Sequence, residues 1–258
     1  MTPALHAEWT KLRTLAANGW LLLGTITLTV TLAAAATAGT NYASTTSVED
    51  TTKLSLTGIY LGQAIVAILA VHVISSEYST GTITVTLTAM PRRLSVLAAK
   101  ATILSGLTLA AGAIAVLGSL LAGRLILPGN GFTRAHGYST LSLAHEPTLR
   151  AAAGSVIYLA LIALLSLGIA TTVRDPAAAI GLMLGLLYLF PIVKQVVSDP
   201  TWQRHLEQIG PMTAGLAIQN TTSTKHLPVS PWHGLGVLAA WSAAALLTGG
   251  LLLRLRDA

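Results

Sequence analysis

The sequence has no cysteine and very little charge. Without a single cysteine among its 258 residues, it can form neither disulfide bonds nor thiolate metal sites. Charged residues make up only 9% of the chain, whereas ordinary soluble domains carry about 25%. So few charges could not cover a soluble globule, and 53% of the residues are hydrophobic. We therefore expect most of the surface to face lipid.

Motifs for catalysis and for ion-coupled transport are also missing. The chain contains no G-x-x-x-x-G-K-[ST] phosphate loop, no G-x-S-x-G and no H-E-x-x-H. Its apolar stretches carry no paired acids or acid–histidine chain of the kind that proton-driven transporters use. The net charge of +6 comes from scattered basic residues rather than from one basic face, so it does not indicate nucleic-acid binding. We predict neither an enzyme nor a metal or cofactor site in this chain.

Six stretches have the length and apolar character of membrane spans. A spanning helix needs about twenty mostly apolar residues. The stretches that qualify are residues 20–38, 56–74, 97–121, 151–173, 177–197 and 235–253. They predict an all-α polytopic membrane protein with one transmembrane domain over residues 1–258. The first stretch is longer than the apolar region of a signal peptide, although the small residues that follow it leave cleavage there as an alternative.

The basic residues indicate an orientation. If the N-terminus is cytoplasmic, eight of the 15 Lys and Arg residues lie in or beside the cytoplasmic segments, which are the shorter set. Positive charge is therefore denser on that side, which favours cytoplasmic N- and C-termini. The fourth and fifth stretches are joined by Arg174-Asp175-Pro176, where Asp175 is a suitable helix cap and Pro176 a suitable first helical residue. This predicts a tight hairpin.

Small and polar residues within the stretches admit two interpretations each. Small residues recur four positions apart, which favours close helix packing, either within the chain or in a face used for dimerisation or movement. The pairs are Gly58 with Gly62, Gly118 with Ala122, and Gly181 with Gly185. Gln63 either forms structural hydrogen bonds or contacts cargo, since a buried amide needs a partner. His72 is most simply an interfacial side chain.

Two segments outside the spans have helical spacing. In the N-terminal segment, Leu5, Trp9 and Leu12 share one face, which predicts an amphipathic helix on the membrane surface that includes Glu8 and Arg13. Between the fifth and sixth spans, Trp202 and Ile209 belong to a short amphipathic helix that Gly210-Pro211 should end. The apolar residues 212–218 that follow are too few to span, so we expect a re-entrant or interfacial segment.

The segment after the second span alternates polar and apolar residues from Thr82 to Thr88, which is a strand pattern. A lone strand beside lipid would leave its backbone groups unsatisfied. Helical wrapping instead places Ile83, Leu87 and Met90 on one face, and Pro91 would end the helix. We predict a short amphipathic helix over residues 82–89 at the cytoplasmic surface.

These features together resemble the ABC-2 type permeases, the membrane subunits of exporters driven by separate ATPase subunits, and most closely the small actinobacterial members. The segments that carry the resemblance are "HAEWTKLRTL", "SSEYSTGTITVTLTAMPRRLSVLAAK", "LGIATTVRDPAAAIGL" and "IGPMTAGLAIQ". The most specific is the E-x-x-x-G pattern of Glu77 and Gly81, followed by Pro91-Arg92-Arg93. The resemblance covers most of the chain.

The resemblance implies the roles of particular residues. Contact with the ATPase would involve Glu77, Tyr78, Gly81, Thr82, Arg92 and Arg93, together with the N-terminal surface helix of Glu8, Trp9 and Arg13. The substrate path, formed mainly by the second and fifth spans, would be lined near Gly62, Gln63, Leu187 and Pro191. The segment of Pro211 and Met212 would act as an outer gate.

The resemblance also implies partners and a location. Two ATPase subunits, which would bind ATP and Mg, would serve a dimer of permeases in the bacterial cell membrane, and a homodimer is preferred to a heterodimer. An aliphatic path with few charges suggests an amphipathic or hydrophobic cargo, such as a drug, an antibiotic, a peptide or a lipid. The alternative is a non-transporting immunity or scaffold subunit that binds a partner in the membrane.

Overall fold

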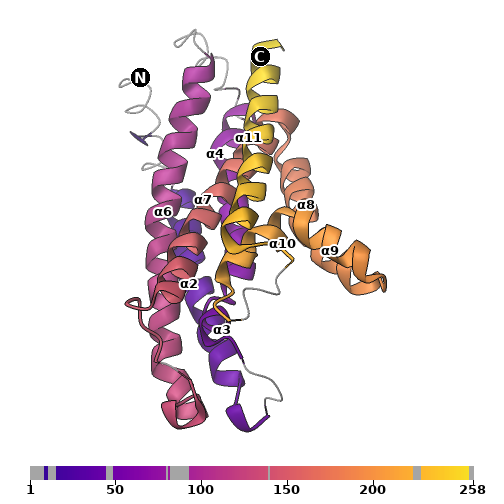
Figure 1. The fold of residues 1–258 in the computed structure, drawn as a ribbon. Coiled ribbons are helices and arrows are strands. Elements are labelled where there is room, and N and C mark those ends of the chain that lie inside the picture. The colour runs from indigo at the N-terminus through magenta and orange to yellow at the C-terminus, as the bar shows by residue number, and fades with distance from the viewer. Residues whose placement is uncertain are drawn as a thin grey trace.

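Six long apolar helices run from one end of the protein to the other in the computed structural model (Figure 1). The structure describes residues 9–10, 16–44, 49–79, 81, 93–138, 140–222 and 228–255. Throughout these ranges the chain forms helices, turns and loops, and no strand. The prediction of an all-α chain with six helices long enough to span a membrane is confirmed.

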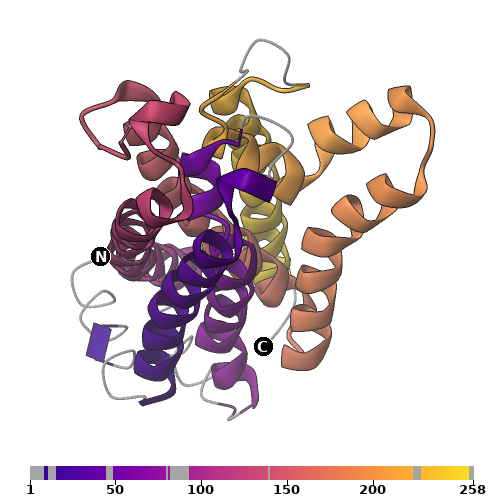
Figure 2. The same ribbon diagram turned by 90° about the horizontal axis from the view of Figure 1, so that it is seen from below.

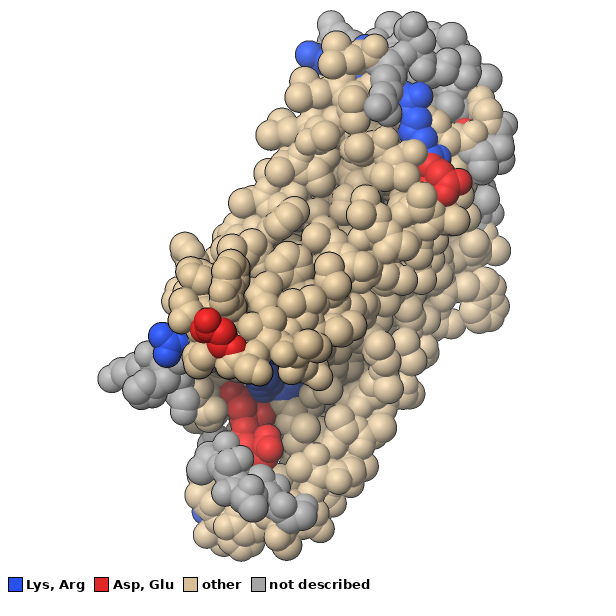
Figure 3. All heavy atoms as spheres, turned by 90° about the vertical axis from the view of Figure 1, so that its right-hand side faces the viewer, with Lys and Arg blue, Asp and Glu red and all other residues tan. Residues whose placement is uncertain are grey.

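The long helices alternate in direction. They are α2 (Ala16–Gly39), α4 (Ile59–Ser79), α6 (Arg93–Ile126), α7 (Glu146–Val173), α8 (Pro176–Val196) and α11 (Pro231–Leu255). We name the two ends of the bundle after α11, so that α4, α7 and α11 finish at the Leu255 end. The charged side chains on the face drawn in Figure 3 gather at the two ends, with an uncharged band between them. This is the distribution that a membrane-spanning bundle needs.

Short helices fill the Pro231 end. They are η1 (Tyr42–Ser44), α3 (Thr51–Ser55), η2 (Leu127–Asn130), η3 (Arg134–His136), α9 (Pro200–Ile209), α10 (Pro211–Gly215) and η4 (Leu216–Gln219). The predicted break at Gly210-Pro211 is confirmed, because Gly210 ends α9 and directly precedes α10. Figure 2 shows α8 and α9 standing out from the other helices, while α10 and η4 return to them.

The second long helix starts later than the sequence suggested. A turn at residues 56–58 separates α3 from α4, and the Asp50 side chain caps α3 by accepting a hydrogen bond from the Lys53 amide at 3.0 Å. Gly58 then lies so close to α2 that a β-carbon there would clash with the Thr29 carbonyl oxygen. Glycine is therefore required for α4 to approach α2 at this crossing.

The helices differ widely in how much of their surface is covered. In α4 and α7, 61% of the span is buried, whereas only 17% of α8 is. The peripheral α8 meets the bundle through one stripe, on which Ala179, Met183 and Leu187 are fully buried. Its hairpin with α7 forms as predicted, because the Asp175 carboxylate accepts a hydrogen bond from the Ala178 amide at 2.7 Å.

Candidate functional sites at the two ends of the bundle

A buried ion pair joins α4 to α6 near the Leu255 end. The Glu77 Oε1 atom lies 2.8 Å from Lys100 Nζ, and only 7% and 1% of the two side chains are exposed. The same ammonium donates to the Val73 carbonyl oxygen at 3.5 Å. Charges removed from water persist only when they are paired and hydrogen-bonded. The pair therefore fixes the last turns of α4 against α6.

The next residue of α4 contacts a different element. The Arg174 guanidinium carbon lies 5.4 Å from the centre of the Tyr78 ring, which is the geometry of a cation–π contact. Arg174 is the first of the two residues between α7 and α8, and it adopts a left-handed backbone with φ of 66°. Glu77 and Tyr78 thus tie the end of α4 to α6 and to the α7–α8 hairpin.

Few of the other residues predicted to contact an ATPase fall in the described parts of the chain. Gly81 has φ of 70°, and its amide donates to the Tyr78 carbonyl oxygen at 3.2 Å, so α4 ends in a tight turn. Trp9 is helical and about half exposed (49%). Arg93 begins α6. Outside the described residues lie Glu8, Arg13, Thr82, Arg92 and the helix predicted over residues 82–89.

Gln63 lies at the centre of a buried hydrogen-bond network in α4. Its Nε2 atom donates to the Tyr60 carbonyl oxygen at 3.1 Å and to the Met212 sulfur at 3.2 Å. The Tyr158 hydroxyl of α7 donates to its Oε1 atom. The amide is fully buried and engaged at both ends, which supports the structural interpretation of this residue. The network brings one predicted path residue, Gln63, against one predicted gate residue, Met212.

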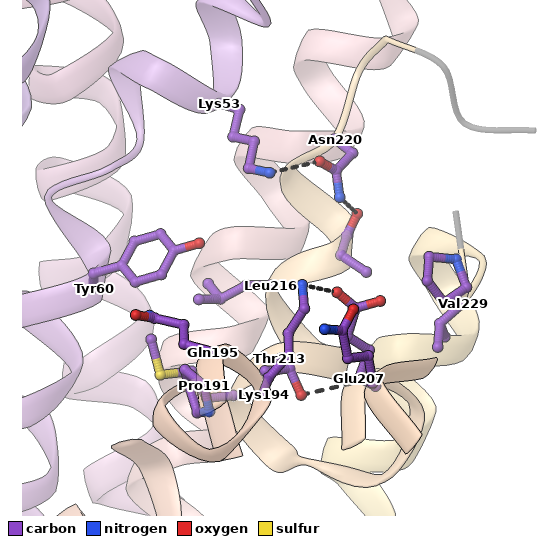
Figure 4. A pocket seen from close by; sticks show the side chains of 14 residues that line it. Lys53, Tyr60, Pro191, Lys194, Gln195, Glu207, Thr213, Leu216, Asn220 and Val229 are labelled. Atoms are coloured by element: carbon purple, nitrogen blue, oxygen red, sulfur yellow. Dashed lines mark hydrogen bonds and ion pairs between the residues drawn. The ribbon is translucent and has the colours of Figure 1, made fainter. Parts of the chain in front are cut away.

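A pocket of about 490 Å³ opens beside this network at the Pro231 end (Figure 4). It lies between the start of α4, the end of α8 and the segment from α9 to η4. Fourteen residues line it: Lys53, Tyr60, Pro191, Lys194, Gln195, Gln203, Glu207, Met212, Thr213, Leu216, Ala217, Asn220, Pro228 and Val229. We call it the α8–α9 pocket.

Only part of the predicted path reaches the α8–α9 pocket. Pro191 and Met212 line the pocket, whereas Pro211, the buried first residue of α10, does not. Leu187 is fully buried in the hydrophobic core. Gly62 faces the Thr29 side chain of α2, so it packs within the chain.

Charged side chains converge on the α8–α9 pocket from elements far apart in the sequence. The Lys53 ammonium donates to the Asn220 side-chain oxygen at 3.0 Å. Lys194 of α8 forms an ion pair with Glu207 of α9, and 39% and 25% of these side chains are exposed. This grouping was not predicted from the sequence, where the two lysines were counted only as charges outside the spans.

The two glycines of α8 face open space in the part of the chain that the structure describes. A β-carbon on Gly181 or Gly185 would have nothing described within 4 Å, whereas one on Gly58, Gly62 or Gly118 would meet α2. The latter three therefore serve packing within the chain. The open face of α8 remains available to lipid or to another helix.

A family model for ABC-2 family transporter proteins matches residues 4–192. The chain belongs to the ABC-2 transporter family. No curated protein matches the sequence. Members of this family are multi-pass membrane subunits that typically lack an ATPase domain and generally pair with ATPase subunits. The match includes both residues of the buried ion pair and ends within α8.

Two functional-site residues of this ABC-2 protein were not predicted from its sequence. Lys100 and Arg174 served only as markers of topology, yet they are the contacts of Glu77 and Tyr78. A lysine just inside a predicted span was itself a signal, because an ionisable group at that depth requires a partner. Its identity depended on how α6 packs against α4.

Proposed function

We propose that the chain is the transmembrane subunit of an ATP-driven exporter in a bacterial cell membrane, with the Leu255 end in the cytoplasm. Two copies of the permease would form the path, and two separate ATPase subunits would bind ATP and Mg. The cargo would be an amphipathic or hydrophobic molecule. Membership of the ABC-2 family and the six spans support this assignment.

The observation that carries the coupling mechanism is the attachment of Glu77 and Tyr78 to two different elements. An ATPase that moves the segment after α4 would displace α6 through Lys100 and the α7–α8 hairpin through Arg174. Because α8 contacts the bundle through one stripe only, it is the helix that can shift at the lowest cost. The chain performs no chemistry, and the coupling is mechanical.

At the outer end, the segment from α9 to η4 would close the path. Met212 of this segment contacts Gln63, so a shift of α8 that carried α9 and α10 with it would open the network beneath the α8–α9 pocket. The open face of Gly181 and Gly185 offers a surface for the second copy, in keeping with a homodimer.

The coupling can be tested with the permease reconstituted in liposomes with the ATPase that co-purifies with it. We expect Tyr78→Ala to reduce permease-dependent ATP turnover severalfold, because the cation–π contact with Arg174 is lost. Tyr78→Phe keeps the ring and serves as the matched control, with turnover near that of the wild type. Equal turnover in both variants would refute the coupling role. An ATPase whose turnover never depends on the permease would instead favour the non-transporting scaffold.

A further inference from the structure

Two polar side chains of the short helix α9 point into the α8–α9 pocket, whereas two large apolar side chains of the same helix are exposed. Gln203 and Glu207, one turn apart, line the α8–α9 pocket. Trp202 and Ile209 are 64% and 54% exposed on the other side. A helix at a membrane surface directs its apolar face into lipid. Gln203 and Glu207 point into the pocket instead, so they give the space behind α9 a polar wall.

The charged groups of the cavity are not balanced. Of the described lining residues three are charged, namely Lys53, Lys194 and Glu207, so their excess is one positive charge. Glu207 is paired with Lys194. The Lys53 ammonium binds only the neutral amide oxygen of Asn220, and no carboxylate of the described residues lies within ion-pair distance of it. A cation held in a partly buried pocket without a counter-charge favours an anionic ligand.

The Lys53 ammonium is held in place rather than free to swing into solvent. Arg150 of α7 donates to the Asn220 carbonyl oxygen at 2.7 Å. Asp50, which caps the helix that carries Lys53, also accepts the hydroxyl hydrogen of Thr221 at 2.7 Å. Both ends of the Lys53–Asn220 contact are thereby anchored. Such preorganisation lowers the entropic cost of binding a ligand at this point.

Part of the cavity wall is apolar. Met212, Leu216 and Val229 line it and are almost completely buried. The volume of about 490 Å³ lies within the range of small-molecule sites. We propose that the α8–α9 pocket binds the anionic headgroup, a phosphate or carboxylate, of an amphipathic molecule. Lys53 and Lys194 contact the anion, and the apolar wall takes the start of the hydrocarbon chain.

The role of the bound amphiphile, as cargo at the outer end of the path, rests on the proposed function. Binding itself requires no ATPase. The test uses the full-length permease in nanodiscs of zwitterionic phosphatidylcholine, with empty nanodiscs as the partition control. Three probes of equal chain length are titrated by calorimetry: dodecyl phosphate, dodecyltrimethylammonium and neutral dodecyl maltoside. We expect saturable binding of dodecyl phosphate alone.

Substitutions identify the binding residues. Lys53→Gln should raise the Kd for dodecyl phosphate about tenfold, because a charge-assisted contact is lost, and Lys53→Arg should restore most of it. Glu207→Gln should tighten binding, because it releases Lys194 from its ion pair. Arg204→Gln is the matched control, since Arg204 lies exposed on the same helix outside the pocket and its loss should leave the Kd unchanged. Folding of each variant is checked by its monodispersity and thermal unfolding.

Several results would overturn the proposal. They are tighter binding of the trimethylammonium probe, equal binding of all three probes, and equal losses in Lys53→Gln and Arg204→Gln. Adding phosphatidylglycerol to the nanodiscs distinguishes the source of the anion. Competition with dodecyl phosphate supports a lipid headgroup as ligand, and lack of competition supports a soluble amphiphile. A permease that binds the probe without stimulating an ATPase would keep this site while refuting the exporter.

Discussion

The helices α4 and α8 are similar in sequence features but differ in how much of their surface is buried. Each has 21 residues and contributes one partner to a Lys–Glu ion pair. Gly181 and Gly185 of α8 are four positions apart, and so are Gly62 of α4 and Gly58 in the turn just before it. Yet 61% of the α4 span is buried, and Gly58 and Gly62 pack against α2. Only 17% of the α8 span is buried, and no described atom packs against Gly181 or Gly185. The same sequence devices thus fix one helix and leave the other free to move or to pair.

The two ion pairs show what the environment does to identical chemistry. Glu77 and Lys100 are almost completely buried, where each charge stabilises the other. Lys194 and Glu207 remain partly in water, where loss of one partner is largely made up by solvent. Four sets of substitutions test the comparison of α4 with α8, from the largest expected effect to the smallest.

Breaking the buried pair should have the largest effect. Glu77→Ala leaves the Lys100 ammonium buried without its carboxylate, and we expect a loss of about 3–5 kcal/mol in the free energy of unfolding. The measurement is reversible unfolding of the detergent-solubilised permease. The double variant Glu77→Leu/Lys100→Leu removes both charges and should recover most of the loss. A double variant as unstable as the single one would contradict the assignment of the cost to an uncompensated charge.

The glycine faces offer the second contrast. Gly58→Ala places a methyl group against the Thr29 carbonyl oxygen, so α4 must shift, at a cost of about 1–3 kcal/mol. Gly181→Ala adds its methyl group to open space, so unfolding stability should stay within about 0.5 kcal/mol or increase slightly. Equal destabilisation by the two substitutions would show that α8 is packed as tightly as α4.

The buried Gln63 amide tests the hydrogen-bond network that joins α4 to α7 and α10. Gln63→Leu leaves the Tyr158 hydroxyl in a buried site without its acceptor, which should cost about 1–2 kcal/mol of unfolding free energy. Tyr158→Phe removes the other partner, and a double-mutant cycle isolates the contact. Such interhelical hydrogen bonds couple by about 0.6 kcal/mol on average in membranes. A coupling free energy of zero would mean that the hydrogen bond between Gln63 and Tyr158 does not stabilise the packing of α4.

The sequence predicted features that depend on local composition. The six spans follow from their apolar length, and the α7–α8 hairpin follows from Asp175 and Pro176, because capping needs only neighbouring residues. The turn at residues 56–58 was missed because Leu56 within the turn and Ile59 directly after it read as the start of one apolar run. Hydropathy indicates which residues avoid water, but it does not show where the backbone leaves the helical conformation.

Contacts between distant segments were beyond sequence reasoning. Lys100 is 23 residues from Glu77, and Arg174 belongs to a different hairpin from Tyr78. The α8–α9 pocket likewise draws its two lysines from α3 and α8. Such pairings are set by how whole helices pack, which no local pattern encodes. Helix packing also explains two predicted path residues that do not line the pocket. Gly62 of α4 and Leu187 of α8 face packing partners instead.

The exposed ion pair of α8 should give the smallest effect on stability. Lys194→Gln or Glu207→Gln should change the free energy of unfolding by about 0–1 kcal/mol, because water replaces the lost partner and salt already screens the pair. Unfolding is measured at low and high ionic strength, and the difference from the wild type should shrink as salt rises. A loss as large as that of Glu77→Ala, or one insensitive to salt, would mean that the end of α8 is held as rigidly as α4. The greater freedom of α8, on which the coupling mechanism depends, would then have no physical basis.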